Sequence, residues 1–203
     1  MILIGYSGHA YVVHGILTAA GIIVTGYCDK EEKAFNPFQL DYYGSEESGE
    51  ALLALQHKGC LIAIGDNPTR CAVYDRLSLK GIRIMNAIHP AAIIDGSVKI
   101  SGQAVMIAAG VIINPFAEIG TGVICNTGCI IEHENRIGNF AHIGPGAVLC
   151  GNVKVGERSF VGANAVIRQG INIGKNALIG AGAVVVKDVQ DHAVITGNPG
   201  RVQ

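Results

Sequence analysis

The sequence is short of charged and aromatic residues. Charged residues fill 15% of its 203 positions, aromatic residues fill 5%, and tryptophan is absent. Globular chains average about 25% charged residues, so this chain is expected to bury a narrow and largely aliphatic interior. The formal net charge of −1 gives no electrostatic reason to expect a nucleic acid or an anionic membrane as a partner.

The N-terminal stretch also lacks charge. No Asp, Glu, Lys or Arg precedes Asp29, and an uncharged stretch of that length would fit a signal peptide or a membrane span. However, Gly5, Ser7 and His14 interrupt it, and no basic segment comes first. We therefore expect a buried strand, a turn and a helix, and no membrane insertion.

The six cysteines show neither a CxxC pair nor another paired metal-ligand spacing. In a chain of this size without a secretion signal, this distribution is typical of reduced and mostly buried thiols, and we expect a cytoplasmic protein. A zinc site that used His133 and His142 would need a third histidine at a matching spacing, and the sequence has none. No metal is therefore expected.

Residues 1–90 alternate between apolar runs and amphipathic segments. We predict strands within residues 1–6, 22–29, 60–66 and 82–88, and helices within residues 10–21, 45–59 and 67–81. Strands that alternate with helices are typical of a parallel sheet with right-handed crossovers. The N-terminal domain, residues 1–90, is therefore predicted to be a Rossmann-like α/β domain.

Residues 91–203 follow a period of six instead. Every sixth residue from Ile119 to Val185 is aliphatic, apart from Cys125, and the position four residues further on is mostly small. A period of six fits neither a helix nor an ordinary strand. It is the signature of a parallel β-helix of hexapeptide repeats, in which three repeats form one triangular coil. Positions 18 residues apart should then stack on one another.

Four motifs connect this architecture to a known family. They are "GYSGHA" at residues 5–10, "AIGDNPTR" at 63–70, "CNTGCIIEHENRIGNFAHIG" at 125–144 and "ITGNPGRV" at 195–202. With them, nearly the whole chain resembles the bacterial sugar O-/N-acyltransferase family, which includes the sialic acid O-acetyltransferases. The resemblance is closest to the N-acetyltransferases of nucleotide-linked 4-amino-4,6-dideoxy sugars, of the bacillosamine and perosamine type.

The resemblance implies a sugar-nucleotide-binding domain at residues 1–90. It also implies a left-handed β-helix acyltransferase domain with a C-terminal tail at residues 91–203. Acetyl-CoA would be the co-substrate, without a metal, and the assembly would be a homotrimer with active sites at the subunit interfaces. The expected activity is N-acetylation of the sugar 4-amino group, for surface glycan or glycoprotein biosynthesis.

The stretch "IIEHENRIG", residues 130–138, is unusually polar for this repeat. Histidine titrates near pH 6.5 and accepts a proton at neutral pH, and a carboxylate on its other ring nitrogen stabilises the charged form. The resemblance implies that His133 is the general base and Glu134 its orienting partner. A solvated corner is the alternative interpretation. Asn135 fills a slot that is otherwise small or aliphatic, and the pattern does not explain it.

Further residues are assigned to the β-helix by resemblance. Asn126 is expected near the reacting sugar, and His142 near the acetyl-CoA thioester. Gly151, which should stack below His133, would let a backbone N–H approach the thioester oxygen. The resemblance extends the coenzyme A groove along Gly180, Ala181 and Arg201, and the guanidinium of Arg201 suits a phosphate.

The loop after the first strand is the candidate sugar-nucleotide site. Ser7, Gly8 and His9 precede a helix, whose N-terminus favours a phosphate. The loop is not a full GxGxxG motif, so a nicotinamide cofactor is not supported. The resemblance adds Asp29 near the base and Gly65 at the same sheet edge. A plain strand-to-helix connection is the alternative.

Two other functions stay open at this point. An O-acetyltransferase of sialic acid or a related sugar would use the same histidine base. A non-catalytic sugar-nucleotide-binding subunit could share the scaffold. The sequence does not distinguish UDP, dTDP and GDP as the nucleotide.

Overall fold

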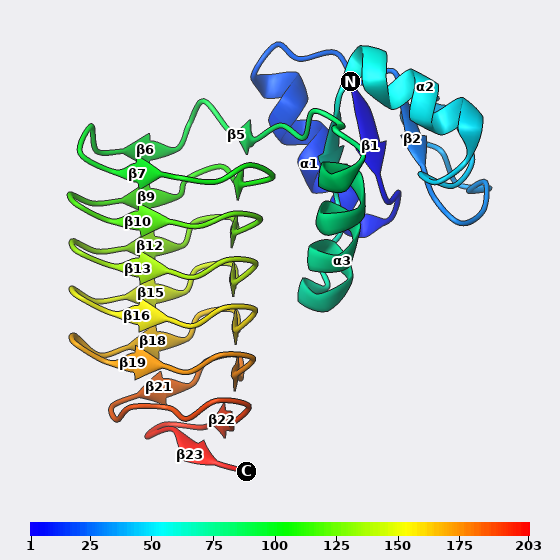
Figure 1. Cartoon of the computed structure of the whole chain (residues 1–203). Coiled ribbons are helices and arrows are strands. Elements are labelled where there is room, and N and C mark those ends of the chain that lie inside the picture. Colours follow the sequence, from blue (N-terminus) through cyan, green and yellow to red (C-terminus); the bar gives the residue numbers. More distant parts are fainter.

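A computed structural model describes all residues, 1–203. The chain forms an N-terminal α/β part beside a tall stack of short strands, and the C-terminus lies at the far end of that stack (Figure 1). This arrangement confirms the predicted fold class. None of the helices is long and apolar enough to cross a membrane.

The α/β part is a four-stranded parallel sheet with three helices, in the strand order β3-β2-β1-β4. Two of the helices begin at side-chain caps: Ser48 accepts from the N–H of Ala51, and Asp66 accepts from the N–H of Thr69. The elements are β1 (Ile2–Ile4), α1 (Gly8–Ala19), β2 (Gly26–Cys28), β3 (Asp41–Tyr42), α2 (Gly49–Lys58), β4 (Cys60–Ile62) and α3 (Asn67–Leu79).

The strand expected within residues 82–88 does not join this sheet as a whole. Ile84 forms only an isolated bridge to Cys60, and β5 (Ala87–Ile88) pairs with the β-helix instead. Asn86 draws the segment toward the β-helix, because its side chain accepts from the N–H of Val105 and donates to the carbonyl of Gly102. The edge of the sheet is completed by β3, a short strand that was not predicted from the sequence.

The β-helix has three faces, which we name after their first strands. The β5 face holds β5, β8 (Met106–Ile107), β11 (Ile124–Cys125), β14 (His142–Ile143), β17 (Phe160–Val161), β20 (Leu178–Ile179), β22 (Val194–Thr196) and the antiparallel β23 (Arg201–Val202). The β6 face holds β6 (Ile93–Ile94), β9 (Ile112–Ile113), β12 (Ile130–Ile131), β15 (Val148–Leu149), β18 (Val166–Ile167) and β21 (Val184–Val185). The β7 face holds β7 (Lys99–Ile100), β10 (Glu118–Ile119), β13 (Arg136–Ile137), β16 (Lys154–Val155) and β19 (Asn172–Ile173).

The register confirms the predicted coil of 18 residues, since Ile131 pairs with Ile113 on one side and with Leu149 on the other. The second residue of each two-residue strand points inward over most of the stack, and these aliphatic side chains form a continuous core with the apolar residues of the α/β part. The outward residues differ between faces. They are aliphatic on the β6 face (Ile93, Ile112, Ile130, Val148, Val166, Val184) and polar on the β7 face (Lys99, Glu118, Arg136, Lys154, Asn172).

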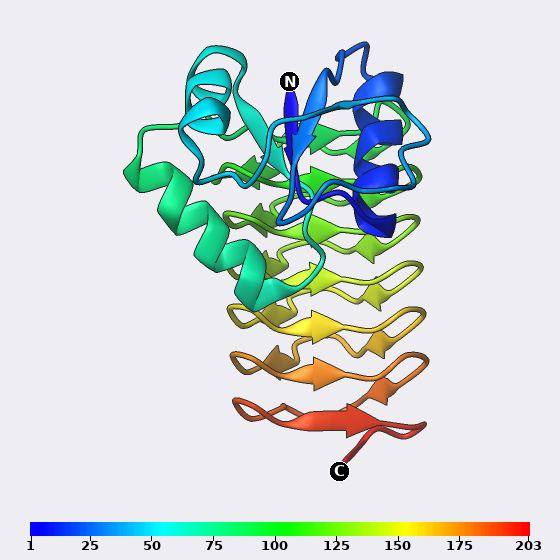
Figure 2. The same cartoon turned by 90° about the vertical axis from the view of Figure 1, so that its right-hand side faces the viewer.

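A buried arginine joins the two parts of the chain. Arg70 of α3 is fully buried and donates to the carbonyls of Gly122 and Phe140 in the β-helix, both at 2.8 Å. Its other N–H groups reach the carbonyls of Ile64 and Gly65 and the side chain of Asn67. Burial lowers the pKa of Arg70 to about 10, so the side chain stays charged at neutral pH. The joint holds α3 alongside the coils (Figure 2).

Candidate active site

His133 lies on the corner between the β6 and β7 faces, which we call the 6/7 corner. Its Nδ1 is 3.1 Å from Oε2 of Glu134, and both side chains are at least half exposed, at 50% and 62%. Its Nε2 makes no hydrogen bond to the protein. A neutral His133 that donates from Nδ1 to Glu134 therefore presents the Nε2 lone pair outward.

The backbone at Glu134 is unusual for a glutamate. Its φ is +61°, in the left-handed region, and the same slot of neighbouring turns holds Gly128, Phe140, Gly146 and Asn152. A residue other than glycine or asparagine costs roughly 1–2 kcal/mol in that conformation. The backbone conformation of Glu134 therefore lowers the stability of the fold locally, while its side chain places a carboxylate beside His133.

Gly151 lies directly below the imidazole of His133. A Cβ atom at Gly151 would come within 2.5 Å of both Cε1 and Nε2 of that ring. The N–H of Asn152 donates to the carbonyl of His133 at 2.8 Å, which ties the two coils together at this corner. Only glycine leaves room for the ring in this position.

Asn135 braces the turn that carries His133. It is fully buried, and its Nδ2 donates to the carbonyls of Glu132 and Cys150, at 2.6 and 3.1 Å. Its Oδ1 accepts from the N–H of Val153 at 3.0 Å. This answers why an amide replaces a small or aliphatic residue here: it closes the turn and fastens it to the next coil. Buried Ser159 makes a similar brace on another corner.

A second group lies where the α/β part meets the β-helix. Nδ2 of Asn126 is 3.1 Å from Nε2 of His142, and Oδ1 of Asn126 accepts from the N–H of Thr127 at 2.8 Å. The Thr127 contact orients the amide, so Nε2 of His142 is an acceptor and its proton is on Nδ1. That buried Nδ1–H makes no hydrogen bond of good geometry, although the backbone of Gly65 lies close enough to favour the charged form of the ring.

His9 approaches the same group from α1, with its ring centre 6.2 Å from that of His142. Burial, together with the charge of Arg70, lowers the pKa of His142 to about 3 and that of His9 to about 4. Both are therefore neutral at pH 7. Nε2 of His9 is also buried without a partner. The second group thus offers unpaired polar atoms but poor proton acceptors.

A cavity of 350 Å³ opens at the carboxyl edge of the α/β sheet. Ser7, Asp29 and Gly65, three of the residues expected at a sugar-nucleotide site, line it. Gly8 and His9 are not part of its lining. His9 instead packs on Gly65, where a Cβ atom would lie 3.7 Å from the imidazole, and so faces the β-helix.

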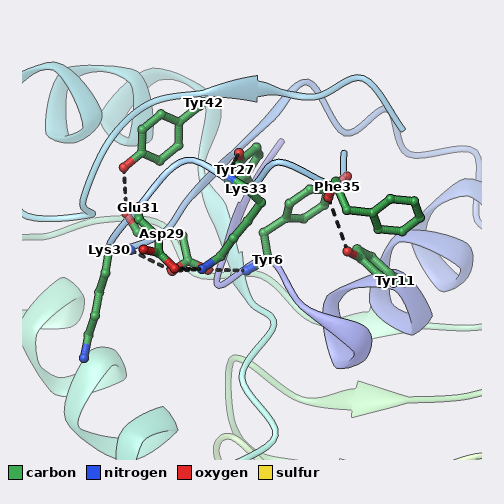
Figure 3. A network of polar contacts seen from close by, with 9 residues as sticks. All are labelled: Tyr6, Tyr11, Tyr27, Asp29, Lys30, Glu31, Lys33, Phe35 and Tyr42. Carbon is green, nitrogen blue, oxygen red and sulfur yellow. Dashed lines mark hydrogen bonds and ion pairs between the residues drawn. The ribbon is translucent and has the colours of Figure 1, made fainter. Parts of the chain in front are cut away.

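Asp29 is occupied by the protein itself (Figure 3). One oxygen accepts from the N–H of Tyr6 at 2.9 Å, and the other accepts from the N–H of Lys30 at 2.7 Å and lies 3.2 Å from Nζ of Lys33. The figure shows the Lys30 side chain turned away from this network. Asp29 therefore shapes the rim of the cavity. Lys30 also lines the cavity, and its ammonium group makes no hydrogen bond or ion pair in the protein.

The remaining predicted residues lie lower on the stack. Gly180 and Ala181 lie on the corner between the β5 and β6 faces, the 5/6 corner, three coils below Asn126. Arg201 lines a cavity of 310 Å³ at the end of the stack together with Lys187. Lys187 was missed in the sequence, although it stands three coils below His133 and the 18-residue step would have found it.

The predicted site residues thus form two separate groups on one chain. His133, Glu134 and Gly151 belong to the 6/7 corner, whereas Asn126, His142 and the α/β cavity lie along the β5 face and its edge. No hydrogen bond joins the two groups.

Comparison with known proteins identifies the family. The PglD N-terminal domain family matches residues 1–77, and the bacterial transferase hexapeptide family (six repeats) matches residues 136–169. PerB from Caulobacter crescentus, solved with CoA and GDP-perosamine, is 36% identical over 100% of this chain and 96% of its own, with a TM-score of 0.91. The chain belongs to the nucleotide-linked amino-sugar N-acetyltransferases.

The chain is also similar to the acetyltransferase domain of PglB from Neisseria gonorrhoeae, which was solved with acetyl coenzyme A. That domain is 29% identical over 100% of this chain and 98% of its own, with a TM-score of 0.90. WeeI from Acinetobacter baumannii shares the fold at 21% identity over 100% of this chain and 98% of its own, with a TM-score of 0.79. This amino-sugar N-acetyltransferase therefore has the architecture of its relatives along its whole length.

Proposed function

We propose that this enzyme transfers the acetyl group of acetyl-CoA to the 4-amino group of a nucleotide-linked 4-amino-4,6-dideoxy sugar, for surface glycan or glycoprotein biosynthesis. The observation that carries the proposal is the His133–Glu134 pair, with Nδ1 held at 3.1 Å by the carboxylate and Nε2 free. The same family includes PerB, which was solved with CoA and GDP-perosamine.

In this reaction His133 is the general base. Its Nε2 takes a proton from the sugar ammonium, and the amine nitrogen then forms a bond to the acetyl carbon. The nitrogen releases its second excess proton to solvent as the carbon–sulfur bond breaks and the amide forms. The proton held by His133 leaves with the CoA sulfur. Glu134 keeps the proton of the neutral ring on Nδ1 and stabilises the imidazolium that forms.

The residues near the thioester can donate hydrogen bonds to the oxyanion that develops on the acetyl oxygen. Gly151 has no side chain between its backbone and the ring of His133. The Nδ1–H of the neutral His142, which makes no hydrogen bond of good geometry in the protein, can donate to a ligand. Further down the 6/7 corner, Lys187 lies three coils below His133, about 14 Å at the usual strand spacing. Lys187 and Arg201 are suited to the CoA phosphates.

The second group becomes part of the site in a homotrimer. The β6 face lies between the 6/7 corner and the 5/6 corner, and its outward side chains are all aliphatic. Three copies that turn their β6 faces toward a common axis bury this apolar surface. The 6/7 corner of each copy then lies beside the 5/6 corner of the next, so that His133 meets the Asn126–His142 pair of its neighbour.

The α/β cavity is the site of the nucleotide in this proposal. Ser7 precedes the N-terminus of α1, which favours the diphosphate, and Lys30 adds a positive charge. The sugar then extends past Gly65 toward His9 and the β5 face. An O-acetyltransferase that acts on a sugar hydroxyl is the second candidate, because the histidine base suits both acceptors.

The test is acetyl transfer to a panel of UDP-, dTDP- and GDP-linked 4-amino sugars and to sialic acid, with release of free CoA thiol as the readout. Thiol release with a nucleotide-linked amino sugar, and an acetamide in the product, support the proposal. Release only with hydroxyl acceptors would assign the enzyme to O-acetylation. Tight binding of a sugar nucleotide without any thiol release would indicate a non-catalytic binding subunit.

A further inference from the structure

The α/β cavity contains an ion pair that the proposed reaction does not use. Nη2 of Arg76 lies 2.9 Å from Oε1 of Glu46, and both residues line the cavity. The Glu46 side chain is only 13% exposed, whereas that of Arg76 is 43% exposed. Oε2 of Glu46 makes no hydrogen bond to the protein, so one oxygen of this carboxylate, in a residue that lines the cavity, is free to accept a hydrogen bond.

The pair stands at the end of the cavity away from the diphosphate. Ser7 leads into α1 after β1, Asp29 follows β2, and Glu46 follows β3 at the edge of the sheet. A nucleotide whose diphosphate lies at α1 and whose ribose lies near the end of β2 extends its base toward that edge. Arg76 and Val73 approach the same place from α3, and Ile4 and Ile64 supply apolar surface for a flat ring.

A carboxylate beside a guanidinium matches one base better than the others. Guanine presents two neighbouring donors, N1–H and N2–H, to a carboxylate, and two acceptors, O6 and N7, to an arginine. Uracil and thymine offer one N–H between two carbonyl oxygens, which would repel a carboxylate. Adenine and cytosine place a ring acceptor next to their amino group, with the same result.

We propose that Glu46 and Arg76 select guanine, so that the sugar substrate of this enzyme is linked to guanosine diphosphate. This inference rests on the proposed function, because it assumes that the nucleotide lies in the α/β cavity. Glu46 accepts from N1–H and N2–H, and Arg76 donates to O6 while it holds Glu46 in place. The pair decides the base, and the catalytic residues on the β-helix are indifferent to it.

The test is the affinity of the full-length enzyme for GDP, UDP, dTDP and ADP, measured by isothermal titration calorimetry. GDP is expected to bind at least about 10-fold more tightly than the others. Glu46→Gln keeps the volume but turns one acceptor into a donor that faces the guanine donors. It should weaken GDP binding by roughly 10- to 100-fold and leave UDP binding unchanged.

Glu47→Gln is the matched control. Glu47 pairs with the same arginine, at 3.2 Å from its Nε, but is 56% exposed and does not line the cavity. This variant should keep the preference for GDP. Arg76→Lys provides a second probe should Glu46→Gln fail to fold, and should also reduce the preference.

Two results would overturn the inference: equal affinity of the wild type for GDP and UDP, or an unchanged GDP preference in folded Glu46→Gln and Arg76→Lys. The outcome is separable from the proposed function. Acetyl transfer to a UDP- or dTDP-linked amino sugar, but not to a GDP-linked one, leaves the reaction intact and refutes guanine selection. Absence of transfer to every acceptor, with a GDP preference that Glu46→Gln abolishes, refutes the reaction and supports the base assignment.

Discussion

The two histidine groups of this protein differ in almost every physical respect. His133 is half exposed on a corner of the β-helix and is paired with a carboxylate. His142 and His9 lie at the joint between the two parts of the chain, where burial lowers their pKa to about 3 and about 4. The exposed histidine has a partner for its charged form, and the buried ones do not.

The difference indicates a division of roles. Proton transfer needs a histidine whose charged form is stabilised, which the carboxylate of Glu134 provides at His133. A neutral histidine with an unpaired N–H, such as His142, is suited to donate a hydrogen bond to an oxygen that becomes negative. In the proposed reaction, one chain therefore carries the base on the 6/7 corner and the donor on the β5 face.

The largest effect is expected from loss of the exposed histidine. His133→Ala should lower kcat by roughly 10²-fold or more, because it removes the general base. Thermal unfolding should be nearly unchanged, since the side chain is half exposed. His57→Ala, which removes an exposed histidine from α2, is the control and should keep full activity. Near-normal turnover of His133→Ala would assign proton transfer elsewhere.

A smaller effect is expected when His133 is displaced rather than removed. Gly151→Ala places a methyl group within 2.5 Å of the His133 ring, which must then turn away from its position beside Glu134. We expect kcat to fall by about 10-fold or more, since misplaced catalytic groups lose much of their advantage. Gly96→Ala, where a Cβ atom meets nothing within 4 Å, is the matched control. Equal kcat values for the two variants would show that the ring position is unimportant.

Glu134→Asn should separate activity from stability. Asparagine tolerates the left-handed backbone that Glu134 adopts at φ +61°, as Asn152 does in the same slot of the next coil. The variant should gain about 1 kcal/mol, seen as a rise in Tm of about 2–4 °C. Its kcat should fall by about 10-fold, because the charge beside His133 is lost. A variant that is both less stable and fully active would contradict the role given to Glu134.

The buried histidines should appear in the acid stability of the fold. Their folded-state pKa values, about 3 and about 4, lie below the unfolded value near 6.5, so the unfolded chain binds more protons in between. These two histidines should therefore leave the free energy of unfolding unchanged above pH 6.5. They should lower it steadily as the pH falls from 6.5 toward 4. Asp66, whose pKa is lowered by hydrogen bonds from Thr69, contributes with the same sign only below about pH 4.

Urea unfolding between pH 8 and pH 4 checks this prediction. The double substitution of His9 by Gln and His142 by Phe should flatten the loss between pH 6.5 and pH 4. A slope that is equally steep in the wild type and the double variant would show that other groups cause the acid sensitivity.

The β-helix was predictable from the sequence because each coil repeats the same inward slots. The six-residue step through Ile131, Ile137 and Ile143 runs unbroken past the polar turn, so both the faces and the stacking of Gly151 under His133 follow from counting. The α/β part was less predictable at its edge. The apolar segment 82–88 had a strand pattern that suited either part of the chain, and side-chain bonds of Asn86 decided between them.

The structural roles of Arg70 and Asn135 could not be predicted from the sequence pattern. From the sequence alone, Arg70 on α3 would be expected at the surface. It is buried because it donates to the carbonyls of Gly122 and Phe140, which lie 52 and 70 residues away in the sequence. Asn135 was noticed as an exception, but its partners Cys150 and Val153 belong to the next coil. Both roles are set by atoms that meet only after the chain has folded.

In the proposed homotrimer the two histidine groups meet across subunits, and this contact can be tested by complementation between two inactive variants. His133→Ala lacks the base, and His142→Phe lacks the Nδ1–H donor but keeps the ring volume, so each homo-oligomer should be nearly inactive. When the two variants are unfolded together, mixed in equal amounts and refolded, random assembly should give each site both intact groups about one time in four. About a quarter of wild-type activity should therefore return. Activity that stays at the mean of the two parent variants would show that the two groups do not form a shared site.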